Sequence, residues 1–166
     1  MTDTPKRDPI NPTTDEVRTE VQALIAAARF GALSFLDPET GHPAVSRIGV
    51  ATLADGTPLT LISDLSAHTA ALKADPRCAL LLGEPSSKGD PLVYPRVSVT
   101  CRAERITGDA ALGEARERYL THHPKAGLYA GFADFGFYRL TPEGALFNGG
   151  FGRAYRLVQG DLLATD

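Results

Sequence analysis

Several features by which protein classes are recognised are scarce in this sequence. It contains no tryptophan, one methionine and two cysteines, Cys78 and Cys101. A disulfide framework needs more cysteines in a shorter secreted chain, so we expect two reduced thiols that pack as small hydrophobic side chains. There is no Cys-x-x-Cys pair for structural zinc. His122 and His123 are adjacent and point apart on a helix, so we expect surface residues and no metal site.

Excess charge and long apolar runs are also missing. Lys and Arg number 17 against 20 Asp and Glu, a net charge of −3. Nucleic-acid binding normally needs a basic stripe, so we expect no such partner. No apolar run approaches the roughly 18 residues that span a membrane, and the polar N-terminus has no signal-peptide pattern. We therefore expect a soluble, cytoplasmic protein.

What is present is the pattern of one globular domain. Residues 1–12 contain three prolines and predict a flexible leader, followed by a single domain over 13–166. Thr13 and Glu16 have the spacing of a capping box at the start of the first helix. Hydrophobic periods and turn signals predict the other elements. They are helices over 14–29, 67–74, 109–120 and from 124, and strands over 30–36, 43–53, 58–63, 77–83, 92–106, 135–140, 145–148 and 153–157.

These elements predict a mainly β protein with peripheral helices. Strands 43–53 and 58–63 are joined by the tight turn 54–57, which predicts a hairpin. Most other strands also follow one another through short connections. We therefore expect a closed or partly closed antiparallel barrel rather than a doubly wound sheet.

Arg47 is the most informative charged residue. It lies in Ala44–Ala51, a strand that reads as apolar on both faces. An arginine is rarely buried without a partner, because an unpaired buried charge is costly. The guanidinium is therefore expected to meet a carboxylate elsewhere in the fold, the solvent, or an anionic ligand.

A second candidate is the segment from Ser63 to Thr69, which runs from a strand end into a helix. The first turn of a helix offers free N–H groups and a partial positive charge, which suit an anion. Ser63, Ser66, His68 and Thr69 add polar side chains there. On its own, the segment fits equally well a simple helix cap at Ser66. Adjacent hairpin strands are about 5 Å apart, so Arg47 and this helix start are predicted to close on one phosphate.

Other segments carry weaker signals. From Tyr94 to Arg102 the residues alternate, with Arg96 on the polar face, which fits a half-exposed strand or one that meets a ligand or a partner subunit. The glycine-rich segment Gly149–Gly152 does not open a helix after a first strand, so it does not predict a dinucleotide site. Familiar catalytic signatures are absent.

The segment Leu61–Thr69, followed by Leu72–Arg77, resembles the phosphate-binding segment of the pyridoxamine 5′-phosphate oxidase-related FMN-binding split barrels. More narrowly, it resembles the branch of HugZ-type haem-degrading proteins. The similarity covers about residues 20–158. Further matches are Gly89–Leu92, Pro95-Arg96, His123-Pro124, Tyr129, Asp134-Phe135, Tyr138–Leu140 and Gly149–Ala154.

This resemblance implies a six-stranded antiparallel split barrel that works as a homodimer, with FMN in clefts between the subunits. Arg47, with Ser46 beside it, is implied to hold the phosphate. Ile62 and Ser63 are implied to contact the flavin. His68 and Thr69 are implied to complete the phosphate site, and Arg96 is a further candidate for cofactor binding.

The implied function is that of an FMN-binding oxidoreductase acting on a small molecule. True pyridoxamine phosphate oxidases carry an Arg-x-His segment near the C-terminus, whereas this sequence has Arg153-Ala154-Tyr155. Haem-degrading relatives carry a further C-terminal domain, whereas this sequence ends at Asp166. A haem-binding or haem-degrading protein, a non-catalytic flavin carrier, and use of another flavin or a deazaflavin therefore remain alternatives.

Overall fold

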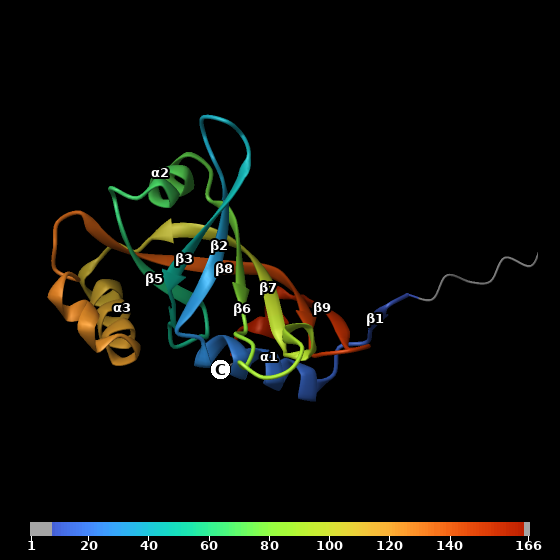
Figure 1. Cartoon of the computed structure of the whole chain (residues 1–166). Helices are drawn as coiled ribbons and strands as arrows, with labels where there is room; N and C mark the ends of the chain where they lie inside the picture. Colours follow the sequence, from blue (N-terminus) through green and yellow to red (C-terminus); the bar gives the residue numbers. More distant parts are fainter. Residues whose placement is uncertain (1–7, 165–166) are drawn as a thin grey trace, which may run out of the picture.

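Six antiparallel strands form a barrel in the computed structural model, which describes residues 8–164 (Figure 1). Their hydrogen-bonded order is β5-β8-β7-β6-β2-β3. The bounds are β2 (Phe30–Leu36), β3 (Pro43–Gly49), β5 (Pro58–Ser63), β6 (Arg77–Leu82), β7 (Arg96–Arg105) and β8 (Phe135–Asn148). The last neighbours, β3 and β5, are bridged by a hydrogen bond from Thr60 Oγ1 to the Gly49 carbonyl, at 2.7 Å, rather than by a ladder. The predicted six-stranded split barrel is therefore confirmed.

Three short strands extend the sheet beyond the prediction. They are β1 (Ile10–Asn11), β4 (Ala51–Thr52) and β9 (Ala154–Val158). The pairing of β1 with β9 is parallel, so the sheet is mixed rather than purely antiparallel. The predicted leader over 1–12 is therefore wrong at its end, because the free edge of β9 supplies partners for Ile10 and Asn11. Residues 1–7 of that leader lie outside the described part of the chain.

Helices surround the barrel (Figure 1). They are α1 (Asp15–Ala27), α2 (Ala67–Ala74), α3 (Asp109–His122) and α4 (Gln159–Leu162), with 3-10 turns η1 (Pro91–Val93) and η2 (Pro124–Leu128). The N-cap of α1 is Thr14, which accepts a hydrogen bond from Val17 N–H, and not Thr13 as predicted. The Thr13 hydroxyl instead donates to the Arg156 carbonyl at 3.0 Å, which ties this helix start to β9. Within residues 8–164, no helix has the length and apolar character needed to cross a membrane.

The predicted strand 43–53 is interrupted at Val50, and this break opens the barrel. The Val50 N–H donates to the Arg29 carbonyl, and the Val50 carbonyl faces His123 Nε2 at 2.8 Å. The predicted hairpin survives only where β4 pairs with β5, at Ala51–Leu59 and Thr52–Pro58. Before the break, β3 pairs with β2, so it leaves the side of β5.

Two other strand predictions needed longer-range information. The strands predicted over 135–140 and 145–148 are one strand, β8, because a register shift against β7 accommodates Pro142 within it. The strand predicted over 92–106 begins only at Arg96, because Asp90 accepts a hydrogen bond from Leu92 N–H and starts the turn η1.

The barrel interior is filled by large apolar side chains. The fully buried ones include Leu33, Leu80 and Phe147, and α1 adds Val21 and Ile25 to the same cluster. A second cluster lies where α3 and η2 cover the outside of β5 and β8. These two clusters fix the positions of β3, β5 and α3, which together form the site described below.

Cys78 and Cys101 lie opposite each other on β6 and β7, and both are free and buried. Burial raises the pKa of Cys78 to about 12 and raises that of Cys101 further. A thiol reagent reacts with the thiolate form. We therefore expect neither cysteine to react in the native protein at pH 8, and both to react after unfolding in denaturant, as measured by absorbance with a chromogenic thiol reagent. Rapid labelling of the native protein, or labelling of neither thiol in denaturant, contradicts this account.

Candidate functional site

A groove of about 380 Å³ lies at the split between β3 and β5. Its walls come from four parts of the chain that are far apart in the sequence. From β3 they are Arg47, Ile48 and Gly49, from β5 and the start of α2 they are Leu61, Ile62, Ser63, Ser66 and His68, and from α3, η2 and β8 they are Tyr119, His123, Tyr129 and Phe135.

Five of the predicted site residues line this groove: Arg47, Ile62, Ser63, Ser66 and His68. The physical reason that the sequence suggested for their proximity was wrong, however. They do not meet as neighbours in a hairpin ladder, because that ladder ends at the pair Ala51–Leu59. They meet across the unpaired gap instead, and the gap is what leaves room for a ligand.

Arg47 is exposed in the single chain, which corrects the prediction of a strand apolar on both faces. Along β3, Ser46 and Ile48 are less exposed, whereas Val45 and Arg47 face outward. The Arg47 guanidinium lies 5.4 Å from the centre of the Phe30 ring, a cation–π contact. Among residues 8–164, no carboxylate forms a salt bridge with Arg47. Its charge is thus available to an anion.

Three other predicted residues do not line the groove of a single chain. Ser46 lies on the face of β3 opposite to Arg47. The buried Thr69 donates its hydroxyl to the Ser63 carbonyl at 2.7 Å, so it joins the strand end to α2. Arg96 donates to the Leu92 and Tyr94 carbonyls, at 2.9 and 3.3 Å, and holds the loop before β7.

A network of hydrogen bonds fixes the loop between β5 and α2. The Ser63 hydroxyl donates to the Asp134 carboxylate at 2.9 Å and accepts from Leu65 N–H at 3.1 Å. Asp64 forms ion pairs with Lys73 at 2.8 Å and Arg105 at 3.3 Å. The hydrogen bond from Lys73, with the nearby Arg105 charge, holds the pKa of Asp64 below its usual range. The loop therefore presents the start of α2 to the groove in a defined position.

Two polar side chains at the start of α2 have unused hydrogen-bonding capacity. Ser66 occupies the N-cap position but makes no side-chain capping hydrogen bond. His68 Nε2 is buried and has no hydrogen-bond partner within the described chain. The imidazole packs edge-on against Phe35, and burial lowers its pKa. His68 is therefore neutral at pH 7 and offers a hydrogen bond or a lone pair rather than a full charge.

The opposite wall is aromatic, and sequence reasoning missed its role. Tyr119 and His123 stack with ring centres 4.5 Å apart, and Tyr129 and Phe135 lie 4.9 Å apart. His122 and His123 are both half-buried, so their prediction as surface residues was wrong. His123 Nε2 is engaged with the Val50 carbonyl. A signal existed in the cluster of aromatic residues between 119 and 135, but that stretch has no single helix or strand period that assigns them to one face.

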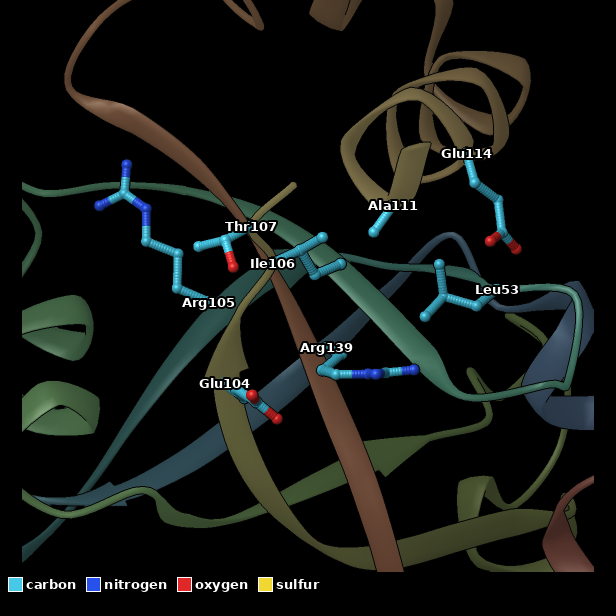
Figure 2. Close-up of a pocket in the computed structure, with 8 residues that line it drawn as sticks. All are labelled: Leu53, Glu104, Arg105, Ile106, Thr107, Ala111, Glu114 and Arg139. Carbon is cyan, nitrogen blue, oxygen red and sulfur yellow. The ribbon is translucent and has the colours of Figure 1, made fainter. Parts of the chain in front are cut away.

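A smaller cavity of about 140 Å³ lies between α3 and the ends of β7 and β8 (Figure 2). Arg139 Nε is buried there without a hydrogen-bond partner among the described residues. Two carboxylates, Glu104 and Glu114, also line this cavity, and Figure 2 shows Arg139 extending toward Leu53. This cavity is small and its two carboxylates offset its two guanidinium groups, those of Arg105 and Arg139, so the groove at the split is the better candidate for a cofactor. Over residues 8–164, no group of three or more His, Cys, Asp or Glu is placed to hold a metal ion.

The lowered pKa of His68 gives a testable pH dependence of stability. In the unfolded chain the imidazole takes up a proton near pH 6.5, whereas in the native protein its pKa lies lower. The unfolded state then binds more protons, so the free energy of unfolding falls as pH drops through 6.5. Below the native pKa of His68 both states are protonated, and the His68 contribution to this loss stays constant. We expect the loss of stability between pH 7.5 and 5.5 to be smaller in His68→Gln than in the parent protein, as measured by urea unfolding. An equal loss in both proteins contradicts the burial of His68.

Comparison with known proteins identifies the setting of this groove. The family model described as pyridoxamine 5′-phosphate oxidase matches residues 17–149. The non-canonical heme oxygenase HOZ of the chloroplast of Arabidopsis thaliana is 31% identical over 143 residues, which are 85% of this chain and 41% of that protein. The chain thus spans less than half the length of this curated relative.

Solved structures share the same barrel. One is 43% identical with a TM-score of 0.85, and the match covers 92% of this chain and 99% of the other. A heme binding protein from Mycobacterium smegmatis is 28% identical with a TM-score of 0.81, and the match covers 92% of this chain and 61% of that one.

Proposed function

This chain belongs to the pyridoxamine 5′-phosphate oxidase family, and we propose that its groove binds FMN as the cofactor of an oxidoreductase that acts on a small molecule. The observation that carries the proposal is the division of the groove into a polar end and an aromatic wall. Arg47, Ser66 and His68 supply donors at one end, and Tyr119 and Phe135 stand on the other side. A flavin mononucleotide has the same division, with a phosphate at one end and a planar ring at the other.

The residues present suit the phosphate. Arg47 supplies the positive charge, and α2 begins beside the groove at Ser66, where the first turn of a helix carries a partial positive charge. His68 Nε2 is buried without a partner in the described chain, so a bound phosphate oxygen would satisfy it. Bound FMN would supply hydride or electron transfer, and this chain would bind and orient it.

We further propose that a second copy of this chain covers the outer face of the sheet. Val45, Leu81 and Leu146 are exposed on this face. The positions between them carry small side chains, which are Ala32, Ser34, Ala79, Ser98 and Gly144. Arg47 and Arg96 stand on the same face of their strands, so a copy packed there would cover both and remove the Arg47 charge from bulk solvent.

The second copy is tested by the mass of the particle. We expect a dimer at micromolar concentration in light scattering, because an obligate interface buries about 2,000 Å² or more. Leu81→Arg places a charge in the centre of the proposed interface and should give monomers. Leu112→Arg, at a partly exposed position on α3, serves as the control and should leave the dimer intact. A monomeric parent protein refutes the proposal.

The phosphate site is tested by comparing FMN with riboflavin. We expect riboflavin to bind much more weakly, since each lost charge-assisted hydrogen bond is worth about 1.5–3 kcal/mol. Arg47→Ala should weaken FMN binding by about 2–5 kcal/mol, the range for truncating one member of a covered charge pair, and should leave riboflavin binding nearly unchanged. Arg116→Ala, on the exposed face of α3, is the matched control. Fluorescence titration of the cofactor-free protein measures all of these affinities. Equal affinity for the two flavins would place the phosphate elsewhere.

The His68 contribution has its own signature. His68 should have a higher pKa in the FMN complex, beside the phosphate, than in the ligand-free protein, where burial lowers it. FMN binding should therefore tighten as pH falls through the pKa of the complex, and should level off below the His68 pKa of the ligand-free protein. The phosphate also takes up a proton near pH 6, which affects every variant equally. Between pH 8 and 6, His68→Gln should therefore flatten the pH dependence relative to the parent protein. The same slope in both proteins would remove His68 from the phosphate site.

A haem-binding or haem-degrading protein is the second candidate. It is favoured by the names of the relatives and by one feature of this chain. Neutral imidazole is the form that ligates metals, and burial keeps His68 neutral with Nε2 unpartnered within the described residues. Absorbance titrations separate the candidates, because haem gives a Soret band that His68→Gln should shift, whereas FMN gives flavin bands. Oxidation of reduced nicotinamide with bound FMN then distinguishes an oxidoreductase from a flavin carrier.

A further inference from the structure

We propose that the Tyr119 hydroxyl is the spacer that holds β3 and β5 apart, so that Tyr119 is a positioning residue for the groove. The spacer itself is a property of the fold and does not depend on which ligand the groove takes. Its effect on FMN binding rests on the proposed function.

The register of the hairpin shows where the spacer acts. Ala51 pairs with Leu59 and Thr52 with Pro58. Because β4 and β5 are antiparallel, each step toward the N-terminus from Ala51 corresponds to one step toward the C-terminus from Leu59. A continued ladder would therefore place Gly49 opposite Leu61, and Arg47 opposite Ser63. All four of these residues line the groove instead.

Side-chain hydroxyls lie where this continued ladder would run. The Gly49 carbonyl accepts the hydroxyl of Thr60 at 2.7 Å, so it is satisfied without bonding to Leu61. The Tyr119 hydroxyl lies directly against Gly49, and Tyr119 lines the groove together with Leu61. Because buried backbone groups must find partners, the bond from Thr60 allows the strands to separate at low cost.

The Tyr119 ring is clamped in this position. It is 3% exposed, stacks on His123 and meets Phe137 edge-on at 5.8 Å. His123 is itself tied to the Val50 carbonyl at the break between β3 and β4. Burial raises the pKa of Tyr119 to about 12, so its hydroxyl stays neutral in the physiological range.

Gly49 gives the hydroxyl the space that it needs. A Cβ at this position would lie 2.3 Å from Tyr119 Oη but 3.4 Å from Cζ, the ring atom behind it. Gly49 has no positive φ, so alanine itself causes no backbone strain there. An alanine at 49 therefore collides with the hydroxyl and makes only an ordinary contact with the ring.

This geometry predicts a specific double-mutant result. Gly49→Ala should lower the Tm of the parent protein by about 3–10 °C, the range for forcing an atom into a packed site of a domain this size. In the Tyr119→Phe background the same change should lower the Tm by less than about a third of that amount, because the colliding atom is gone. In the Tyr129→Phe background, which alters another tyrosine of the groove, the full loss should remain.

Two further measurements connect the spacer with the groove. In Tyr119→Phe the hydroxyl no longer holds the two strand edges in place, so hydrogen exchange at Leu61 N–H should speed up about tenfold or more, whereas Tyr129→Phe should leave it unchanged. FMN affinity should fall at least about tenfold in Tyr119→Phe, because the two edges are no longer held at a fixed separation. If the parent protein fails to bind FMN, the proposed cofactor is wrong, and the Tm cycle and Leu61 exchange still test the spacer. Equal Tm losses in the Tyr and Phe backgrounds, or unchanged Leu61 exchange, would overturn it.

Discussion

The fold of this protein depends on one interrupted ladder. The strands β4 and β5 leave the turn as an ordinary hairpin, but pairing stops at Ala51–Leu59. Val50 turns its N–H toward Arg29 and its carbonyl toward His123, and β3 continues beside β2 instead. Six strands then close a barrel with one seam that lacks backbone pairing. The groove is this seam, so the same irregularity that costs a few ladder hydrogen bonds creates the candidate site.

The polar end of the groove suits an anion because the positive charge of Arg47 there is unpaired within residues 8–164. The carboxylates of Asp64 and Asp134 are close by, but Lys73, Arg105 and the Ser63 hydroxyl engage them. Arg47 has no salt bridge among residues 8–164, and α2 begins beside it. Because Lys73 and Arg105 offset the charge of Asp64, this carboxylate does not cancel the positive potential that a phosphate or another anionic group would meet.

Local chemistry made much of this arrangement readable from the sequence. The turn residues and hydrophobic periods predicted the bounds of β2, β5 and α2 as the structure has them. Strand-end and helix-start residues also identified Ser63, Ser66 and His68 as neighbours, because they are neighbours in the chain. The apolar strand around Arg47 had already marked it as a candidate, the family resemblance added Ile62, and all five line the groove.

Features set by distant parts of the chain were not predictable in the same way. The break at Val50 depends on His123, which lies 73 residues further along the chain. The outward direction of Arg47 depends on which face of β3 meets the core, and apolar residues on both sides of it obscured that choice. Thr13 looked like a helix cap until β9 supplied a carbonyl for its hydroxyl. The aromatic wall likewise forms only when α3 and η2 pack against β5 and β8.

A crystal structure of the full chain grown with FMN measures most directly whether the seam holds the cofactor. We expect one flavin in each seam between β3 and β5, with its phosphate within hydrogen-bonding distance of Arg47 and of the start of α2. A flavin bound elsewhere, or a seam closed by direct pairing of Gly49 with Leu61, would contradict the account.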